Sequence, residues 1–257
     1  MTVVQLIARA EADRIEAPAR CGGCPVRHRG LCALLGDGEI NALHAISRHL
    51  TLPAGTTIPR EGPRAVASGR IVSGLAKVVS RLEDGRQQLV ALLFPSDIFG
   101  LFHLGPSKHP TRFDVVTASD TVLCQYSTGG LKTIVETFPE LETKLLRSAL
   151  TELEGAREWH VVLGRMTAGE RVATFFHRYI ARALREQDMA GDGLPFPLSR
   201  SDVAAALDLT LETVSRHIAH LKRSGAIAFE GTHIITGFDL AALASLSGTT
   251  DHSAAGD

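Results

Sequence analysis

The chain has 257 residues, of which 44% are hydrophobic, and its formal net charge at pH 7 is −1. This length exceeds that of a typical single domain, so we expect two domains and a connecting element. The balanced charge gives no overall sign of nucleic-acid binding, and apolar runs such as residues 89–94 are too short to span a membrane. The first twenty residues do not resemble a secretory signal, which favours a cytoplasmic location without a membrane partner.

Three of the four cysteines lie in one short segment, CGGCPVRHRGLC, at Cys21, Cys24 and Cys32. In a reducing cytoplasm such clustering indicates metal binding or redox chemistry rather than a disulfide scaffold. Two residues separate Cys21 from Cys24, a spacing that lets a loop turn both thiolates onto one metal centre. Basic neighbours can offset the negative charge of bound thiolates, namely Arg20, Arg27, His28 and Arg29.

The next segment, GDGEINALHAISRHL, places Ile40, Leu43 and Leu50 on one helical face, which predicts a short helix over residues 39–50. Between residues 51 and 128, short β-prone runs alternate with turn residues and predict an antiparallel roll or barrel. The fourth cysteine, Cys124, lies in the last of these runs. Taken alone, a single cysteine on a strand is more often a small buried hydrophobe than a metal ligand.

After Phe138-Pro139 the apolar period becomes helical, with steps of three and four residues that are typical of a coiled coil. We expect this stripe to pair with a second copy of the chain about a two-fold axis. The alternative is that the stripe packs against the chain's own barrel. A packed, hydrogen-bonded role is expected for the histidine in the stripe, rather than haem ligation. The stripe consists of Leu146, Ala149, Leu153, Ala156, His160 and Leu163.

Residues 167–187 continue as an amphipathic helix, and a loop rich in glycine and proline follows. The side chains expected to face inward on this helix are Val172, Phe175, Phe176, Tyr179 and Ile180. In the stretch PLSRSDVAAALDLTLETVSRHIAHLKRSG, Ser201 can cap one helix and Thr210 a second, around a tight turn. This arrangement predicts a helix-turn-helix, and GAIAFEGTHIIT predicts a two-stranded wing beside it. The alternative is a helical hairpin with a solvated, charged face.

Five residues near the start of the second helix are left exposed and face the DNA major groove in such a motif. Arg216 can hold guanine through two parallel hydrogen bonds, and Glu212 can accept one from cytosine. Lys222 and Arg223, at the far end, are better placed to contact phosphate. The exposed set is Glu212, Thr213, Ser215, Arg216 and His217.

These segments resemble the Crp/Fnr superfamily of bacterial transcription regulators. LTLETVSRHIAHLKRSGAI resembles its recognition helix, and DGRQQLVALLFPSDIFGL resembles part of its β-roll sensor domain. The likeness covers nearly all of residues 20–248, and the cysteines make it greatest to the Fnr branch. That branch reads DNA half-sites with a Glu-x-x-Ser-Arg set, which corresponds here to Glu212, Ser215 and Arg216.

The resemblance implies an oxygen-responsive regulator whose oxygen-labile 4Fe-4S cluster is held by Cys21, Cys24, Cys32 and Cys124. It also implies a homodimer that binds a palindromic site on double-stranded DNA and acts with RNA polymerase. A structural zinc site and a disulfide-forming thiol sensor remain alternatives for the same cysteines. A regulator gated by another effector, with incidental cysteines, is a third alternative.

The cyclic-nucleotide branch of the superfamily carries a Gly-Glu pair and an Arg-Ser or Arg-Thr pair. The corresponding stretch here, FGLFHLGPSKHPTRFDVVTAS, lacks both pairs, and Arg112 precedes a phenylalanine instead. We therefore expect no cyclic-nucleotide binding. The chain also lacks the G-x-S-x-G, Walker and His-Glu-x-x-His motifs, so it is not expected to be an enzyme.

The expected fold class is α+β: an N-terminal β-roll like the jelly roll of cyclic-nucleotide-binding domains, a long dimerisation helix and a C-terminal winged helix-turn-helix. The expected order begins with a cysteine-containing segment over residues 1–38 and a β-roll sensor domain over 39–138. The dimerisation helix follows over 139–164, then the winged helix-turn-helix over 165–248 and a frayed tail over 249–257.

Overall fold

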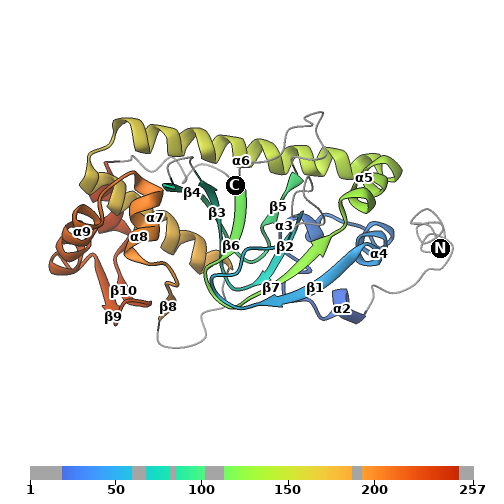
Figure 1. Cartoon of the computed structure of the whole chain (residues 1–257), viewed down its shortest axis with the longest axis horizontal. Helices are drawn as coiled ribbons and strands as arrows, with labels where there is room; N and C mark the ends of the chain where they lie inside the picture. Colours follow the sequence, from blue (N-terminus) through green and yellow to red (C-terminus); the bar gives the residue numbers. More distant parts are fainter. Residues whose placement is uncertain (1–18, 60–67, 82–84, 102–112, 187–192, 249–257) are drawn as a thin grey trace. The chain divides into compact units, whose positions relative to one another are not determined.

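The computed structural model describes residues 19–59, 68–81, 85–101, 113–186 and 193–248 (Figure 1). The chain divides into two units, Met1–Ser80 with Ala91–Leu153 and Arg81–Val90 with Glu154–Asp257. Within the described ranges, no helix is long and apolar enough to cross a membrane. The expected frayed tail, and most of the stretch on which the cyclic-nucleotide prediction depends, lie outside these ranges.

The helix expected over residues 39–50 is shorter than predicted. Helix α4 spans Asp37–Ala45, and strand β1 begins almost at once, at Ser47–Leu52. Leu50 satisfies helical spacing from Ile46 but also satisfies strand alternation with Leu52, and both leucines pack on the interior of the roll. Antiparallel pairing of β1 with β7 decides between the two patterns, because it gives the backbone of residues 47–52 its hydrogen-bond partners.

The predicted β-roll is confirmed and consists of two antiparallel sheets. The first has the order β1-β7-β2-β5, with β2 at Ser68–Ser73, β5 at Ile98–Phe99 and β7 at Thr121–Tyr126. The second has the order β4-β3-β6, with β3 at Ala76–Arg81, β4 at Gln87–Leu93 and β6 at Phe113–Thr117. Strand β7 lies between β1 and β2, so both of its edges are paired (Figure 1).

The alternating side chains of β7 enter two different cores. Leu123 is fully buried in the interior of the roll with Ile71 and Phe99. Tyr126 and Cys124 belong to the opposite face, where a second apolar cluster also contains residues of α4 and of the helices that follow the roll. Strand β7 therefore contributes side chains to both cores, and Cys124 lies on the face that packs against α4 and the helices that follow the roll.

Two helices follow the roll. Helix α5 spans Thr128–Thr137 and was not anticipated from the sequence; Ser127 caps it by accepting a hydrogen bond from Gly130 N at 3.2 Å. Helix α6 spans Pro139–Arg165 and covers the residues expected for the long helix. Leu141 and Leu145 of α6 pack in the same apolar cluster as Cys124, so the first turns of this helix belong to the core beside β7.

Helix α7, Ala168–Glu186, begins the C-terminal region and carries a continuous aromatic face. Phe176 lies 5.3 Å from Phe196 and 5.9 Å from Phe229, measured between ring centroids. Tyr179 donates a hydrogen bond to Pro195 O at 2.6 Å, which satisfies the only polar atom of that buried side chain. Every residue predicted to face inward is buried, namely Val172, Phe175, Phe176, Tyr179 and Ile180.

The winged helix-turn-helix is confirmed, with α8 at Arg200–Leu207, α9 at Leu211–Arg223 and wing strands β9 at Ile227–Glu230 and β10 at Ile234–Phe238. The predicted cap of α8 was wrong: Ser199, not Ser201, is the cap. Its hydroxyl accepts from Asp202 N at 3.0 Å, and the Asp202 carboxylate accepts from Ser199 N at 2.9 Å. The remaining elements are β8 at Leu194–Pro195, which adds a third strand to the wing, and α10 at Leu240–Ser247.

Candidate functional site

The four cysteines lie on two segments that the fold brings together. Cys21 is in the short helix α2, Ala19–Gly22, Cys24 follows in a turn, and Cys32 is in α3, Gly30–Ala33. Cys124 is on β7. All four are free thiols and half-buried, and Cys21, Cys32 and Cys124 pack against the same apolar cluster. About ninety residues of chain separate Cys32 from Cys124, so only the tertiary structure makes them neighbours.

The thiols are close enough to influence one another's ionisation. Burial raises the pKa of Cys21, and negative charge on Cys32 or Cys24 would raise it further. Burial raises the pKa of Cys124 to about 11, and the other three cysteines add to the rise. In the absence of a cation Cys21 and Cys124 are therefore neutral thiols at pH 7, and a set of thiolates can form there only with positive charge supplied beside it.

The donor set fits a thiophilic metal centre. Four cysteine sulfurs are the ligand number and type that suit a 4Fe-4S cluster or a tetrahedral zinc ion. Within the described part of the chain, no three histidine, cysteine or acidic side chains are already arranged to hold a metal ion. The cysteines are neighbours at the edge of one apolar cluster, and binding would require them to converge further.

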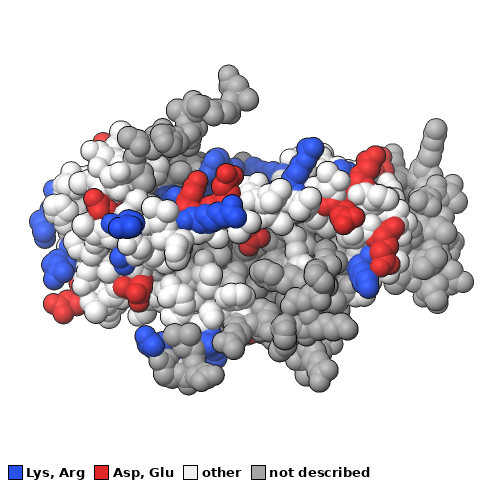
Figure 2. Space-filling view, turned by 90° about the horizontal axis from the view of Figure 1, so that it is seen from above, with Lys and Arg blue, Asp and Glu red and all other residues white. Residues whose placement is uncertain are grey.

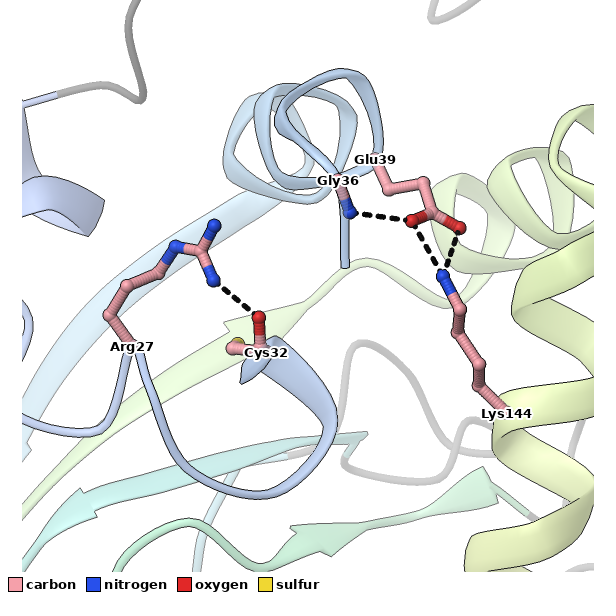
Figure 3. A network of polar contacts seen from close by, with 5 residues as sticks. All are labelled: Arg27, Cys32, Gly36, Glu39 and Lys144. Carbon is pink, nitrogen blue, oxygen red and sulfur yellow. Dashed lines mark hydrogen bonds and ion pairs between the residues drawn. The ribbon is translucent and has the colours of Figure 1, made fainter. Parts of the chain in front are cut away.

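Two arginine side chains hold the loop between the cysteines by donating hydrogen bonds to main-chain carbonyl oxygens of the loop. Arg27 Nη1 donates to Cys32 O at 2.5 Å, and Figure 3 shows its guanidinium turned toward that oxygen. Arg70, on β2, donates through Nη2 to Val26 O at 2.8 Å and also to Arg29 O. Gly30 has a φ of +51°, and an added Cβ would lie 3.0 Å from Ser96 O, so the loop requires glycine where it crosses Arg70.

An ion pair links the helices beside this loop. Lys144 Nζ, from α6, lies 2.9 and 3.1 Å from the two carboxylate oxygens of Glu39 on α4. The same carboxylate accepts a hydrogen bond from Gly36 N at 2.8 Å, as Figure 3 shows. The first turns of α6 are therefore joined to the segment that carries Cys32 through both apolar packing and charge.

Among the basic residues proposed from the sequence to balance thiolate charge, the structure supports Arg27, whose charge lowers the pKa of Cys21 against the larger effect of burial. Arg70 was not anticipated from the sequence as a neighbour of the cysteines. The sequence carried a weak signal, because strand alternation in SGRIVSG places Arg70 on the same face as the apolar Val72, which is buried.

Helix α9 presents most of the residues predicted to read DNA. Thr210 caps it by accepting from Thr213 N at 3.2 Å, and Val214, Ile218 and Leu221 hold it against the domain core. Glu212, Ser215 and Arg216 are exposed on the other side. A single helical face therefore carries the Glu-x-x-Ser-Arg set with all three side chains exposed.

The two other residues of that predicted set are partly engaged within the protein. The Thr213 hydroxyl accepts a hydrogen bond from the Thr210 hydroxyl at 2.9 Å. His217 is half-buried, with its ring beside Gly169 at the start of α7. Burial lowers its pKa, and the charges of Arg216 and His220 lower it further, so the imidazole is neutral at pH 7.

The residues predicted to contact phosphate lie at the end of α9. Arg223 and Lys222 are both exposed, and Lys222 Nζ lies 4.8 Å from the ring centroid of Phe229 in the wing. On the face seen in Figure 2, basic and acidic side chains are interspersed among uncharged ones. DNA affinity must therefore depend on the local groups of α9 and its surroundings rather than on overall charge.

The predicted dimer stripe on α6 is largely uncovered. Leu146 is 57% exposed and Leu153 45% exposed, and Ala149, Ala156 and His160 are exposed as well. Leu163 is half-buried. Leu145 and Val162, which lie outside the stripe, are buried. The helix thus buries some of its apolar side chains within the chain and leaves most of the stripe exposed.

A β-roll followed by a long helix and a winged helix-turn-helix defines a class of DNA-binding transcription regulators. Comparison with protein-family models agrees: residues 49–138 match the cyclic nucleotide-binding domain, and residues 170–246 match the Crp-like helix-turn-helix domain.

The chain belongs to the Crp/Fnr family. It is 37% identical over 235 residues to the transcriptional activator protein FnrL of Cereibacter sphaeroides, covering 89% of this chain and 92% of the relative. It is 32% identical to the nitrogen fixation regulation protein FixK of Bradyrhizobium diazoefficiens, covering 81% of this chain and 86% of FixK. The solved structure of FixK2 from Bradyrhizobium japonicum matches with a TM-score of 0.69 and 28% identity, covering 80% of this chain and 99% of that chain.

Proposed function

We propose that this chain is an oxygen-responsive transcription regulator in which Cys21, Cys24, Cys32 and Cys124 hold a 4Fe-4S cluster. The observation that carries the proposal is that four free thiols from two distant segments lie near one another, beside the apolar cluster that includes the first turns of α6. The similarity to FnrL supports it, as does the similarity to a relative named fumarate and nitrate reduction regulatory protein from Salmonella typhimurium.

When bound, the cluster supplies reactivity toward oxygen and bonds that join the cysteine loop to β7. The protein itself couples this link between the cysteine loop and β7 to the position of α6. With Cys32 and Cys124 held together, the loop stays packed against α4, and the Glu39–Lys144 pair keeps α4 against the first turns of α6. This packing favours the orientation of α6 in which its exposed stripe pairs with a second copy.

Dimerisation sets how the protein reads DNA. Two copies of α9 related by a two-fold axis would enter successive major grooves of a palindromic site, with half-sites about one helical turn apart. When the thiols separate, the fixed orientation of α6 is lost, and affinity for both the second subunit and DNA falls. At promoters the dimer would act together with RNA polymerase.

The test is the iron and acid-labile sulfide content of protein purified without oxygen, with visible absorption recorded before and after exposure to air. About four iron and four sulfide per subunit, with bleaching in air, are expected for this ligand set. Zinc without a visible band would replace the cluster by a structural metal site. Neither metal, with disulfides forming in air, would make the cysteines a thiol-redox sensor.

We further infer that the domain has no cyclic-nucleotide ligand, although its family model is named for that function. The inference depends on the absence of the Gly-Glu and Arg-Ser or Arg-Thr pairs from residues 99–119. Isothermal titration of the purified protein with cyclic AMP should give no binding heat at micromolar concentrations. Saturable submicromolar binding would contradict it.

A further inference from the structure

Arg70 is a charged residue in a buried position, where its guanidinium requires compensating interactions. Its side chain is only 2% exposed, and it is among the largest fully buried side chains of the described residues. Removing a guanidinium from water is costly unless an opposite charge or a full set of hydrogen bonds replaces the solvent. In the described part of the chain, Arg70 forms no ion pair with a carboxylate.

Its hydrogen bonds are also incomplete. Nη2 donates to Val26 O and Arg29 O, both in the loop between Cys24 and Cys32. The Nε and Nη1 atoms are buried and have no acceptor among the described residues. A buried group with unused donors and an uncompensated charge indicates an anionic partner beside it.

The register of the sheet shows where that partner would lie. Arg70 on β2 is directly opposite Cys124 on β7, so the two side chains share one face of the sheet. Gly69 makes this pairing possible, because a Cβ there would lie 2.6 Å from Cys124 O. Arg70 thus lies between the two segments that supply the thiols.

We propose that Arg70 is a positioning residue that supplies the counter-charge of the thiolate site while tying the cysteine loop to β2. The inference rests on the proposed function, because it requires the thiols to bind a metal centre as thiolates. Four thiolates around a metal centre leave an anionic group, and a fixed cation without solvent around it would favour the bound, ionised state.

The alternative is that Arg70 only straps the loop through its two carbonyl contacts. Two variants separate the roles. Arg70→Lys keeps the charge, whereas Arg70→Gln keeps N–H donors for the carbonyls but is neutral. Arg48→Gln is the matched control, because Arg48 lies on the neighbouring strand β1, is exposed and donates to Gln125 Oε1 at 2.9 Å.

The experiment is titration of each reduced, metal-free protein with Co²⁺ under argon at constant pH, followed by the sulfur-to-cobalt charge-transfer absorption. For Arg70→Gln we expect Co²⁺ affinity about 10- to 100-fold below wild type, as is typical when a neighbour of metal ligands is lost. Arg70→Lys and Arg48→Gln should bind nearly as tightly as the wild type.

Wild-type Co²⁺ affinity in Arg70→Gln, or equal losses of affinity in the Lys and Gln variants, would overturn the counter-charge role. Arg70 would then only hold the loop through its two carbonyl contacts. If Arg70→Gln does not fold, Arg70→Lys decides: a loss of about tenfold or more would overturn the proposal. If the wild-type protein gives no charge-transfer band and also contains no iron or zinc when purified, the proposed function fails instead. Cobalt binding by the wild type with an unaltered Gln variant would leave that function standing.

Discussion

At the scale of single residues, we expect DNA recognition to depend most on Arg216. Its side chain is exposed on α9 and free of the intramolecular contacts that engage Thr213 and His217. Replacing Arg216 by alanine should lower affinity for the preferred site by about 1–3 kcal/mol and relax the preference at one base pair of each half-site. Fluorescence anisotropy with a site selected from random DNA by the wild-type protein measures this.

Arg223→Ala is the control for that prediction, because Arg223 is exposed at the far end of the same helix. It should weaken binding to all sequences alike and reduce the slope of log affinity against log salt by about one. If both variants lose affinity equally on specific and random DNA, base reading by Arg216 is wrong.

At the scale of elements, the contact between α4 and α6 depends on the Glu39–Lys144 ion pair. Glu39→Gln would leave the Lys144 charge without its partner. Because the Lys144 side chain is 21% exposed, we expect a loss of unfolding free energy of about 2 kcal/mol, below the 3–5 kcal/mol typical of fully buried pairs. Urea unfolding followed by circular dichroism measures the change.

The matched control is Glu136→Gln, which removes an ion pair with Lys132 on α5. Both side chains of that pair are more than 60% exposed, so its loss should change the unfolding free energy by less than about 0.5 kcal/mol. Equal effects of the two variants would mean that the Glu39 contact does not hold the helices together.

At the scale of the whole molecule, the uncovered apolar stripe of α6 predicts the oligomeric state. Leu153→Glu would place two carboxylates near the proposed two-fold axis and remove two buried leucines. The dimer should weaken by roughly 100-fold or more, since burial of each leucine contributes about 1.5–3 kcal/mol. Sedimentation velocity of protein purified without oxygen measures the dissociation constant.

Thr151→Glu provides the comparison, because Thr151 is exposed on the opposite side of the same helix from the stripe. It should leave the dimer intact. A wild-type protein that is monomeric at micromolar concentration would show that α6 serves another purpose.

Much of the architecture was predictable because local patterns and tertiary environment agree. The inward residues of α7 and the alternating residues of the strand around Leu123 follow simple periods, and the Thr210 cap of α9 follows from residue type. Prediction failed for elements whose existence depends on pairing with distant segments of the chain. Strand β5 and strand β8 have two residues each, too few for a period to appear.

The sequence by itself determined the order of elements, the helix-turn-helix and the set of cysteines, because each depends on spacing along a few turns or one short loop. The tertiary structure decided which distant segments come into contact. It ended α4 at Ala45 by pairing the next residues with β7, and it brought Cys124 beside a loop some ninety residues earlier. It also buried Arg70 opposite Cys124. Burial and cross-strand register are properties of contacts between distant segments, and a local pattern does not contain them.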